Sequence, residues 1–149
     1  MFDSNKDKEK DKEEDRLILG YGTIVRESAL LTTTEGILFG FLLEISINSP
    51  ESFSLINRIT LLVALYSITI AISLFVMPVI YHHLQYPYRD LEKFKERSHK
   101  FMIFGLIPAG LTLYLALEIA LSFTVGREIA FGLAAIPFLL VYLLFKKRK

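Results

Sequence analysis

The chain has 149 residues, no cysteine and a net charge of +1, and 52% of its residues are hydrophobic. Its mean hydropathy is positive although the first sixteen residues are very polar, so the apolar residues must be concentrated in later segments. The lack of cysteine excludes disulfides, thiol catalysis and cysteine metal sites.

Residues 1–28 form a charged segment before the first apolar block. Lys, Asp and Glu alternate through its first sixteen positions, a composition that predicts a largely disordered cytoplasmic tail. The alternative is a charge-laced helix that extends on contact with a partner, because Asp7, Asp11 and Asp15 recur at four-residue spacing beside basic residues. The near balance of charge argues against nucleic-acid binding, which needs a strongly basic face. We expect no signal peptide, so that the first crossing itself directs insertion.

Four apolar blocks follow, each close to the roughly 20 helical residues that cross a bilayer. The second has no charged residue between Ile59 and Ile80, whereas a soluble amphipathic helix would show a polar residue every three or four positions. A β-barrel would need many alternating segments of about ten residues. We therefore predict an all-α fold, a four-transmembrane-helix bundle of antiparallel, up-down helices over residues 29–145. The expected crossings are 29–47, 59–81, 101–123 and 129–145.

The basic residues predict the orientation of these crossings. Fifteen Lys and Arg lie in the two tails and the middle connection, and two lie in the other connections. Since Lys and Arg are retained on the cytoplasmic side, we predict a cell-membrane protein with both termini, including the basic end 146–149, in the cytoplasm.

The middle connection is expected to lie against anionic inner-leaflet lipids. Its interfacial residues are His82, His83, Arg89, Lys93, Arg97 and Lys100. Metal binding by the histidines is the alternative. It is disfavoured because adjacent histidines on a helix point apart and no acidic residue sits at ligand spacing with them. We predict no metal and no cofactor.

Three carboxylates lie inside the predicted crossings, where ionisable side chains are costly and mark candidate functional sites. Glu44 and Glu118 are about 5 and 8 Å from the ends of their crossings, at the surface that Arg58 and Arg127 also border. Pairing with these arginines is favoured over a transport role.

Glu35 lies deeper, about 9 Å from the cytoplasmic end of its crossing, and Arg26 is the nearest basic residue in sequence. A neutral, hydrogen-bonded or water-exposed carboxyl group is expected there. Thr32, one turn earlier, belongs to the same polar half of the crossing, and Tyr114 is a further polar candidate one turn from Glu118.

Small residues form a stripe along two of the crossings. Gly36 and Gly40 make a G-x-x-x-G pair, and Gly105, Ala109 and Ala116 repeat the spacing in the third crossing. Such stripes let helices approach closely, either within one bundle or between subunits.

Two short motifs and the basic connection resemble a known group of proteins. The segments are EGILFGFLL at Glu35–Leu43 and PVIYHHL at Pro78–Leu84. Over roughly residues 26–124 the chain resembles a family of small four-span prokaryotic integral membrane proteins of unknown function. The resemblance implies the same topology, a polar residue at Glu35 and a Pro and His pair closing the second crossing. Glu44 departs from the pattern of this family, in which a small or hydroxylated residue is expected at that position.

The sequence contains no catalytic, metal or nucleotide motif, which favours a non-enzymatic protein that assembles with itself or with a membrane partner. The alternative is a proton or cation conduit in which Glu35 lines a pore or relay. An enzyme acting on lipid through His82, His83 and Asp90 is the weakest hypothesis, because no base and nucleophile are spaced to work together.

Overall fold

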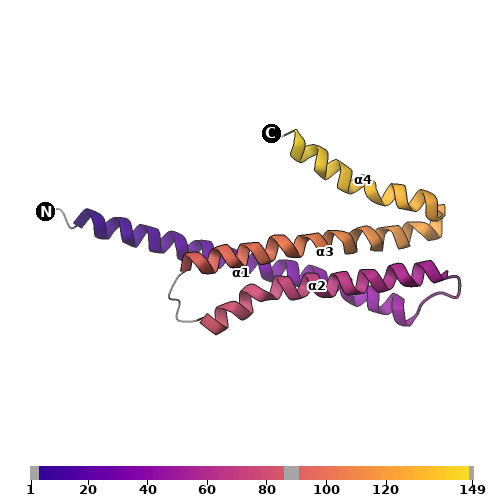
Figure 1. Cartoon of the computed structure of the whole chain (residues 1–149), viewed down its shortest axis with the longest axis horizontal. Helices are drawn as coiled ribbons and strands as arrows, with labels where there is room; N and C mark the ends of the chain where they lie inside the picture. Colours follow the sequence, from indigo (N-terminus) through magenta and orange to yellow (C-terminus); the bar gives the residue numbers. More distant parts are fainter. Residues whose placement is uncertain (1–3, 86–90, 148–149) are drawn as a thin grey trace. The chain divides into compact units, whose positions relative to one another are not determined.

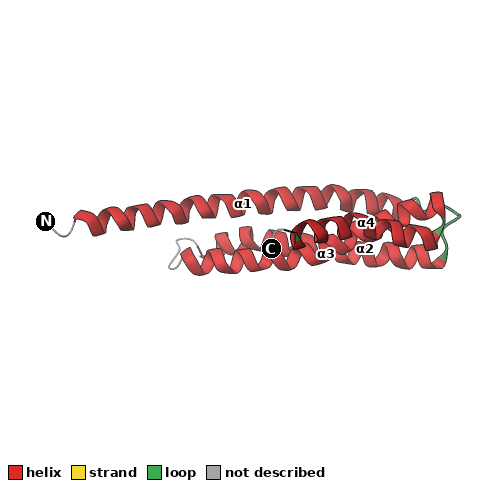
Figure 2. Cartoon of the chain, turned by 90° about the horizontal axis from the view of Figure 1, so that it is seen from above, coloured by secondary structure: helices red, strands yellow, loops and turns green. Residues whose placement is uncertain are grey.

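The computed structural model describes residues 4–85 and 91–147, and nearly all of them are helical (Figure 1, Figure 2). The helices are α1 (Ser4–Ile47), α2 (Leu55–Gln85), α3 (Leu91–Val125) and α4 (Arg127–Lys146). No strand occurs in the described residues, in agreement with the predicted all-α fold. Each helix contains one predicted crossing and is long and apolar enough to span a membrane.

The charged N-terminal segment is part of α1 from Ser4 onward. The formation of such a helix on contact with a partner stays a prediction. Oppositely charged residues three or four positions apart in a sequence favour a helix by a few tenths of a kcal/mol per pair.

The helices divide into two packing units. Unit 1 comprises Met1–Gly36 and Ala71–Leu106, and unit 2 comprises Ile37–Ile70 and Ile107–Lys149. Long helices α1, α2 and α3 therefore each contribute to both units, whereas α4 belongs to unit 2 alone.

Unit 1 packs around two fully buried aromatic rings, those of Phe75 on α2 and Phe94 on α3. A Cβ at Gly105 would lie 2.6 Å from the Phe75 ring, so only glycine allows α3 to approach this close. Ser28 of α1 donates a hydrogen bond to the Phe75 carbonyl. Phe94 stacks on Tyr81 with ring centroids 5.4 Å apart. These contacts join all three helices of the unit.

Unit 2 has a core of small and aliphatic side chains. Ala64 and Ile68 of α2 are completely buried, as is Thr112 of α3, whose hydroxyl oxygen lies 2.9 Å from Pro108 O on its own helix and 3.4 Å from Ala64 O on α2. α4 buries Ala130 and Ala134. Because alanine and threonine are small, the helix backbones can lie close together here.

Hydroxyl side chains within the apolar helices bond to the backbone one turn earlier. Thr33 Oγ1 lies 2.8 Å from Ala29 O, and Thr69 Oγ1 lies 2.8 Å from Leu65 O. This bond satisfies a hydroxyl without water, which allows threonine to occur in a helix of membrane-spanning composition.

Candidate functional site

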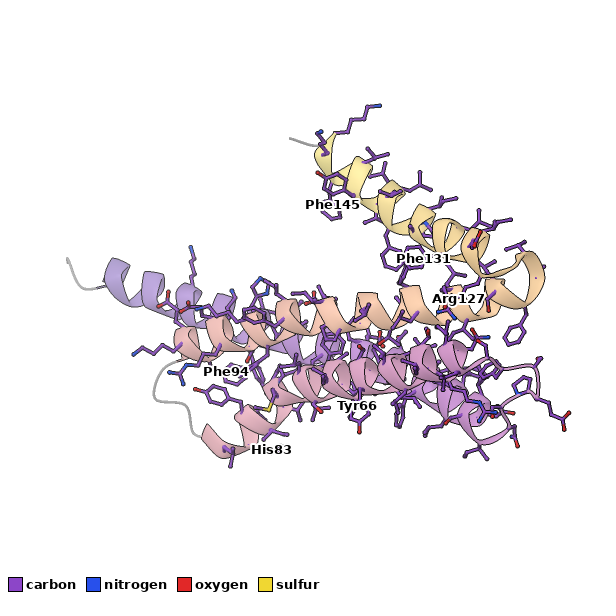
Figure 3. The ribbon with its side chains drawn as sticks, turned by 45° about the vertical axis from the view of Figure 1, so that its right-hand side comes forward. Tyr66, His83, Phe94, Arg127, Phe131 and Phe145 are labelled. Carbon is purple, nitrogen blue, oxygen red and sulfur yellow. The ribbon has the colours of Figure 1, made fainter. Side chains whose placement is uncertain are left out.

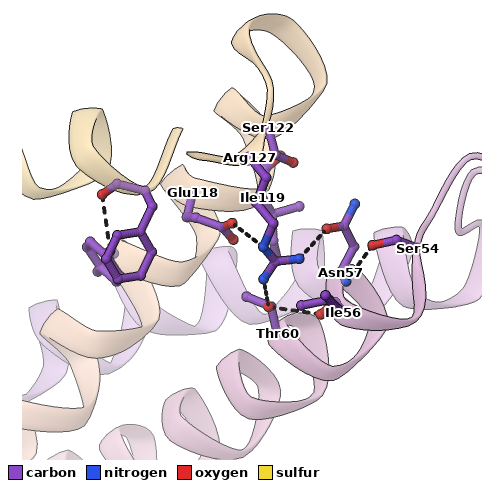
Figure 4. Close-up of polar contacts among 10 residues, drawn as sticks. Ser54, Ile56, Asn57, Thr60, Glu118, Ile119, Ser122 and Arg127 are labelled. Atoms are coloured by element: carbon purple, nitrogen blue, oxygen red, sulfur yellow. Dashed lines mark hydrogen bonds and ion pairs between the residues drawn. The ribbon is translucent and has the colours of Figure 1, made fainter. Parts of the chain in front are cut away.

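The most connected polar cluster of unit 2 lies where α3 ends and α4 begins. One residue, Gly126, joins Val125 to Arg127, and its backbone has φ 81° and ψ 156°. This conformation is nearly restricted to glycine, because a Cβ would clash with the neighbouring backbone. The turn places the first side chain of α4 beside the end of α3 and the start of α2 (Figure 3, Figure 4).

Arg127 is the centre of this cluster, and its guanidinium group contacts α2 through two hydrogen bonds. Nη1 donates to Asn57 Oδ1 at 3.1 Å and Nη2 donates to Thr60 Oγ1 at 3.3 Å. Thr60 in turn donates to Ile56 O at 2.9 Å, and Ser54 Oγ accepts the Asn57 backbone N–H at 3.2 Å (Figure 4). Ser54 thus caps the start of α2 and helps to hold Asn57 in place.

Glu118 of α3 completes the cluster as the counter-ion of Arg127. Its carboxylate lies 3.6 Å from Arg127 Nε, the side chain is only 2% exposed, and the arginine is 38% exposed. Neither carboxylate oxygen has a hydrogen-bond partner among the described residues. The ion pair is therefore the main compensation for burying this charge, and it is the pairing that the sequence favoured for Glu118.

Tyr114 provides a second contact between α3 and α4. Its hydroxyl donates to Phe131 O at 3.2 Å, and its ring meets those of Phe131 and Phe138 edge-on, with centroids 5.7 and 6.0 Å apart. Together with the Arg127 cluster it fixes the first half of α4, whereas residues from Leu139 to Lys147 are exposed.

Glu35 of α1 is buried in unit 1, with 5% of its surface exposed. Its Oε2 atom is enclosed and has no hydrogen-bond partner among the residues that the structure describes. Thr32 is half-buried one turn earlier on the same helix. An enclosed carboxylate oxygen without a partner marks Glu35 as the strongest single-residue candidate of unit 1.

Glu44 has a different environment from Glu35, as their nine-residue separation on one helix predicts. It is exposed, and no ion pair joins it to Arg58 among the described residues. The pairing expected between these two residues is thus not part of this structure. Glu44 instead borders a groove in unit 2.

The glycines of the two stripes lie in contrasting surroundings. Gly105 is packed against Phe75, and Ala109 beside it is 5% exposed, whereas Ala116 is half-buried. Gly36 and Gly40 are exposed, and a Cβ at either would meet nothing within 4 Å. The described part of the chain therefore leaves the G-x-x-x-G pair of α1 uncovered.

One basic residue of the middle connection, Arg97, contacts Tyr81 of α2 in unit 1. Arg97 Nη1 donates to the Tyr81 hydroxyl at 2.8 Å, and its guanidinium carbon lies 5.9 Å from the ring centre. Lys100 bonds to Glu96 at 2.6 Å on the surface.

Among the other predicted interfacial residues, the half-buried His82 ring lies 5.2 Å from the exposed His83 ring. Lys93 is exposed. Arg89 and Asp90 lie outside the described residues, as do the last two residues of the basic end. No group of three or more His, Asp and Glu side chains that could hold a metal ion occurs in the described part of the chain.

Asn57 and Thr60 are the site residues that sequence reasoning missed. Their signal is a pair of polar residues three positions apart on either side of the start of the second crossing, which has no charged residue.

No curated protein and no solved structure matches the chain. A family model does match it, over residues 10–146, and so covers all four helices apart from the first residues of α1. The resemblance seen in the two short motifs is thereby extended to nearly the whole sequence, and the chain belongs to the family of unknown function DUF6328.

Proposed function

We propose that this chain is a non-enzymatic multi-pass membrane protein that acts by assembling with a second copy of itself or with another membrane protein through α1. In this proposal the four helices cross the membrane in alternating directions, both termini are cytoplasmic, and the interfacial residues of the middle connection contact anionic lipids. The distribution of Lys and Arg, fifteen against two, supports this orientation.

The observation that carries the assembly proposal is the uncovered G-x-x-x-G pair. A Cβ at Gly36 or Gly40 would meet nothing within 4 Å. Only 11% of the most apolar window of α1 is buried, the same share as in α4, against 39% for α2 and 33% for α3. A small-residue stripe lets a second helix approach closely in lipid, where packing and not the hydrophobic effect favours association.

Cysteine crosslinking in membranes tests this proposal, and the cysteine-free sequence gives no background. Single variants Gly36→Cys and Gly40→Cys are expected to form one discrete crosslinked species. Thr34→Cys is the matched control, because it is also exposed and lies about 160° around the helix from Gly36. Equal crosslinking at all three positions would show random collision and overturn the proposal.

Bulky replacements provide the complementary test. Gly36→Ile and Gly40→Ile are expected to reduce the associated fraction at least tenfold, measured by energy transfer between labelled copies in bilayers. Since a Cβ at either position meets no other part of the described chain, the helical content and thermal stability of the monomer should change little. Unchanged association in both variants would place the contact elsewhere.

A proton or cation conduit is the second candidate function, and the buried Glu35 favours it. An enclosed carboxylate oxygen without a hydrogen-bond partner is costly at membrane depth and is typical of ion pathways. Reconstituted protein is then expected to pass protons or alkali ions, and Glu35→Gln should abolish the flux while Glu44→Gln retains it. Flux no greater than that of protein-free vesicles would eliminate this candidate.

A further inference from the structure

Unit 2 contains an open apolar groove between α1 and α3. Its volume is about 410 Å³, within the roughly 300–1,000 Å³ typical of small-molecule sites. The buried side chains of Leu42 and Ile119, which are 2% and 3% exposed, form part of its wall. Phe53, stacked on Phe123 with centroids 5.3 Å apart, lines it as well.

The hollow arises from two alanines on α3. Ala116 and Ala120 are one turn apart on the same face, and both line the groove. Their side chains end at Cβ, so they leave space that leucine or phenylalanine would fill. The groove is thus a consequence of sequence, and a single larger residue can close it.

Glu44 is the one ionisable side chain among the lining residues of this groove. Asn48, one turn later, also lines it, and its backbone N–H donates to Glu44 O at 2.9 Å. Glu44 is exposed and takes part in no ion pair among the described residues. The Glu44 charge is consequently available to a ligand.

The surrounding charges favour a cation. The segments 44–58 and 118–128, which flank the two connections of unit 2, contain four glutamates and two arginines. One of these arginines is engaged by Glu118, Asn57 and Thr60. A positively charged ligand is therefore attracted to this end of the unit and an anion is repelled.

We infer that the groove binds an amphiphilic organic cation, such as a quaternary ammonium or phosphonium compound with a bulky apolar body. The apolar body occupies the space over the two alanines, and the cationic centre lies at the edge beside the Glu44 carboxylate. The aromatic faces of Phe53 and Phe123 add a weaker attraction for such a cation. A lipid acyl chain would use the apolar walls but would gain nothing from the carboxylate.

The test compares two ions of the same shape and opposite charge, tetraphenylphosphonium and tetraphenylborate. Binding to the full chain in nanodiscs of uncharged lipid is measured by equilibrium dialysis, with empty nanodiscs subtracted. We expect saturable binding of the cation and none of the anion. Glu44→Gln should weaken cation binding about tenfold, and Ala120→Leu should abolish it by filling the groove.

Two controls separate this result from general effects. Glu51→Gln removes another exposed carboxylate of the same end of unit 2 that does not line the groove, and it should weaken binding much less than Glu44→Gln does. Gly36→Ile, which blocks the proposed assembly, should also bind the cation normally, so the two proposals can fail independently. Because Glu44 is exposed, its replacement should not disturb folding, which circular dichroism of the variant checks.

Two outcomes would overturn the inference. Equal uptake of tetraphenylborate would identify the groove as a site for apolar molecules of any charge, a lipid acyl chain included. Undiminished cation binding by Glu44→Gln would remove the role of the carboxylate, even if Ala120→Leu still lowered binding.

Discussion

At the scale of single residues, Glu118 illustrates how an apolar helix accommodates a charge. An ionised carboxylate inside a membrane-spanning segment costs several kcal/mol unless it is paired or hydrated. Glu118 has no hydrogen-bond partner in the described residues and relies on Arg127, which also bonds to two residues of α2. Arginine suits this position because its planar guanidinium can donate to several acceptors at once.

We predict that Arg127→Gln lowers the free energy of unfolding by about 1–3 kcal/mol, because it leaves a buried carboxylate without its counter-ion. The loss is smaller than the roughly 3–5 kcal/mol of a fully buried pair, since Arg127 is 38% exposed. The measurement is reversible unfolding in mixed micelles, followed by helical circular dichroism. The exposed Arg58→Gln serves as the control and should change stability by less than about 0.5 kcal/mol.

A double-mutant cycle isolates the ion pair itself. In Glu118→Gln combined with Arg127→Gln, the loss of stability should be smaller than the sum of the single losses by about 0.5–3 kcal/mol. Strictly additive losses would mean that the two side chains do not interact, and that Arg127 stabilises the fold through Asn57 and Thr60 alone.

At the scale of elements, the crossings could be predicted because hydropathy alone determines them. Each predicted crossing lies inside one observed helix, and the helices continue beyond it. α3, for example, begins at Leu91, ten residues before the apolar block at Phe101. Polar residues extend a helix as well as apolar ones do, so hydropathy predicts the apolar part of a helix and not its ends.

The contacts between elements were only partly predictable. Arg127 could be matched to Glu118 because both flank the same connection, but Asn57 and Thr60 are 70 and 67 positions away from Arg127. Sequence periodicity shows that Gly36 and Gly105 each belong to a small-residue stripe. It does not show that Gly105 meets Phe75 whereas Gly36 meets nothing within 4 Å, because that depends on how the helices rotate as they pack.

The α3–α4 connection leads to a prediction about glycine. Gly126→Ala should lower stability by about 1–3 kcal/mol, because alanine is strained at φ 81° and ψ 156°. Gly132 lies within α4, and a Cβ added there would meet nothing within 4 Å. Gly132→Ala should therefore raise stability by up to about 1 kcal/mol, because alanine has the higher helix propensity. Micellar unfolding of both variants is the measurement, and equal effects would show that the conformation of Gly126 is not what stabilises the turn.

At the scale of the whole molecule, one membrane topology has to account for both the distribution of basic residues and the number of helices. The fifteen basic residues of the tails and the middle connection can share one side of the membrane only if the number of crossings is even. Four helices of spanning length meet this condition.

The topology can be tested with single cysteines, since the native sequence has none. Lys12→Cys and Lys147→Cys should react with a membrane-impermeant maleimide only after cells are permeabilised, and Ser52→Cys should react in intact cells. All three positions are exposed, so accessibility reports the side of the membrane. Ala64→Cys, at a completely buried position, is the negative control and should stay unlabelled in both conditions. Labelling of Lys12→Cys and Lys147→Cys from opposite sides of the membrane would require an odd number of crossings. Labelling of Ser52→Cys only after permeabilisation would show that the connection between the first two crossings lies in the cytoplasm, which is the opposite of the predicted orientation.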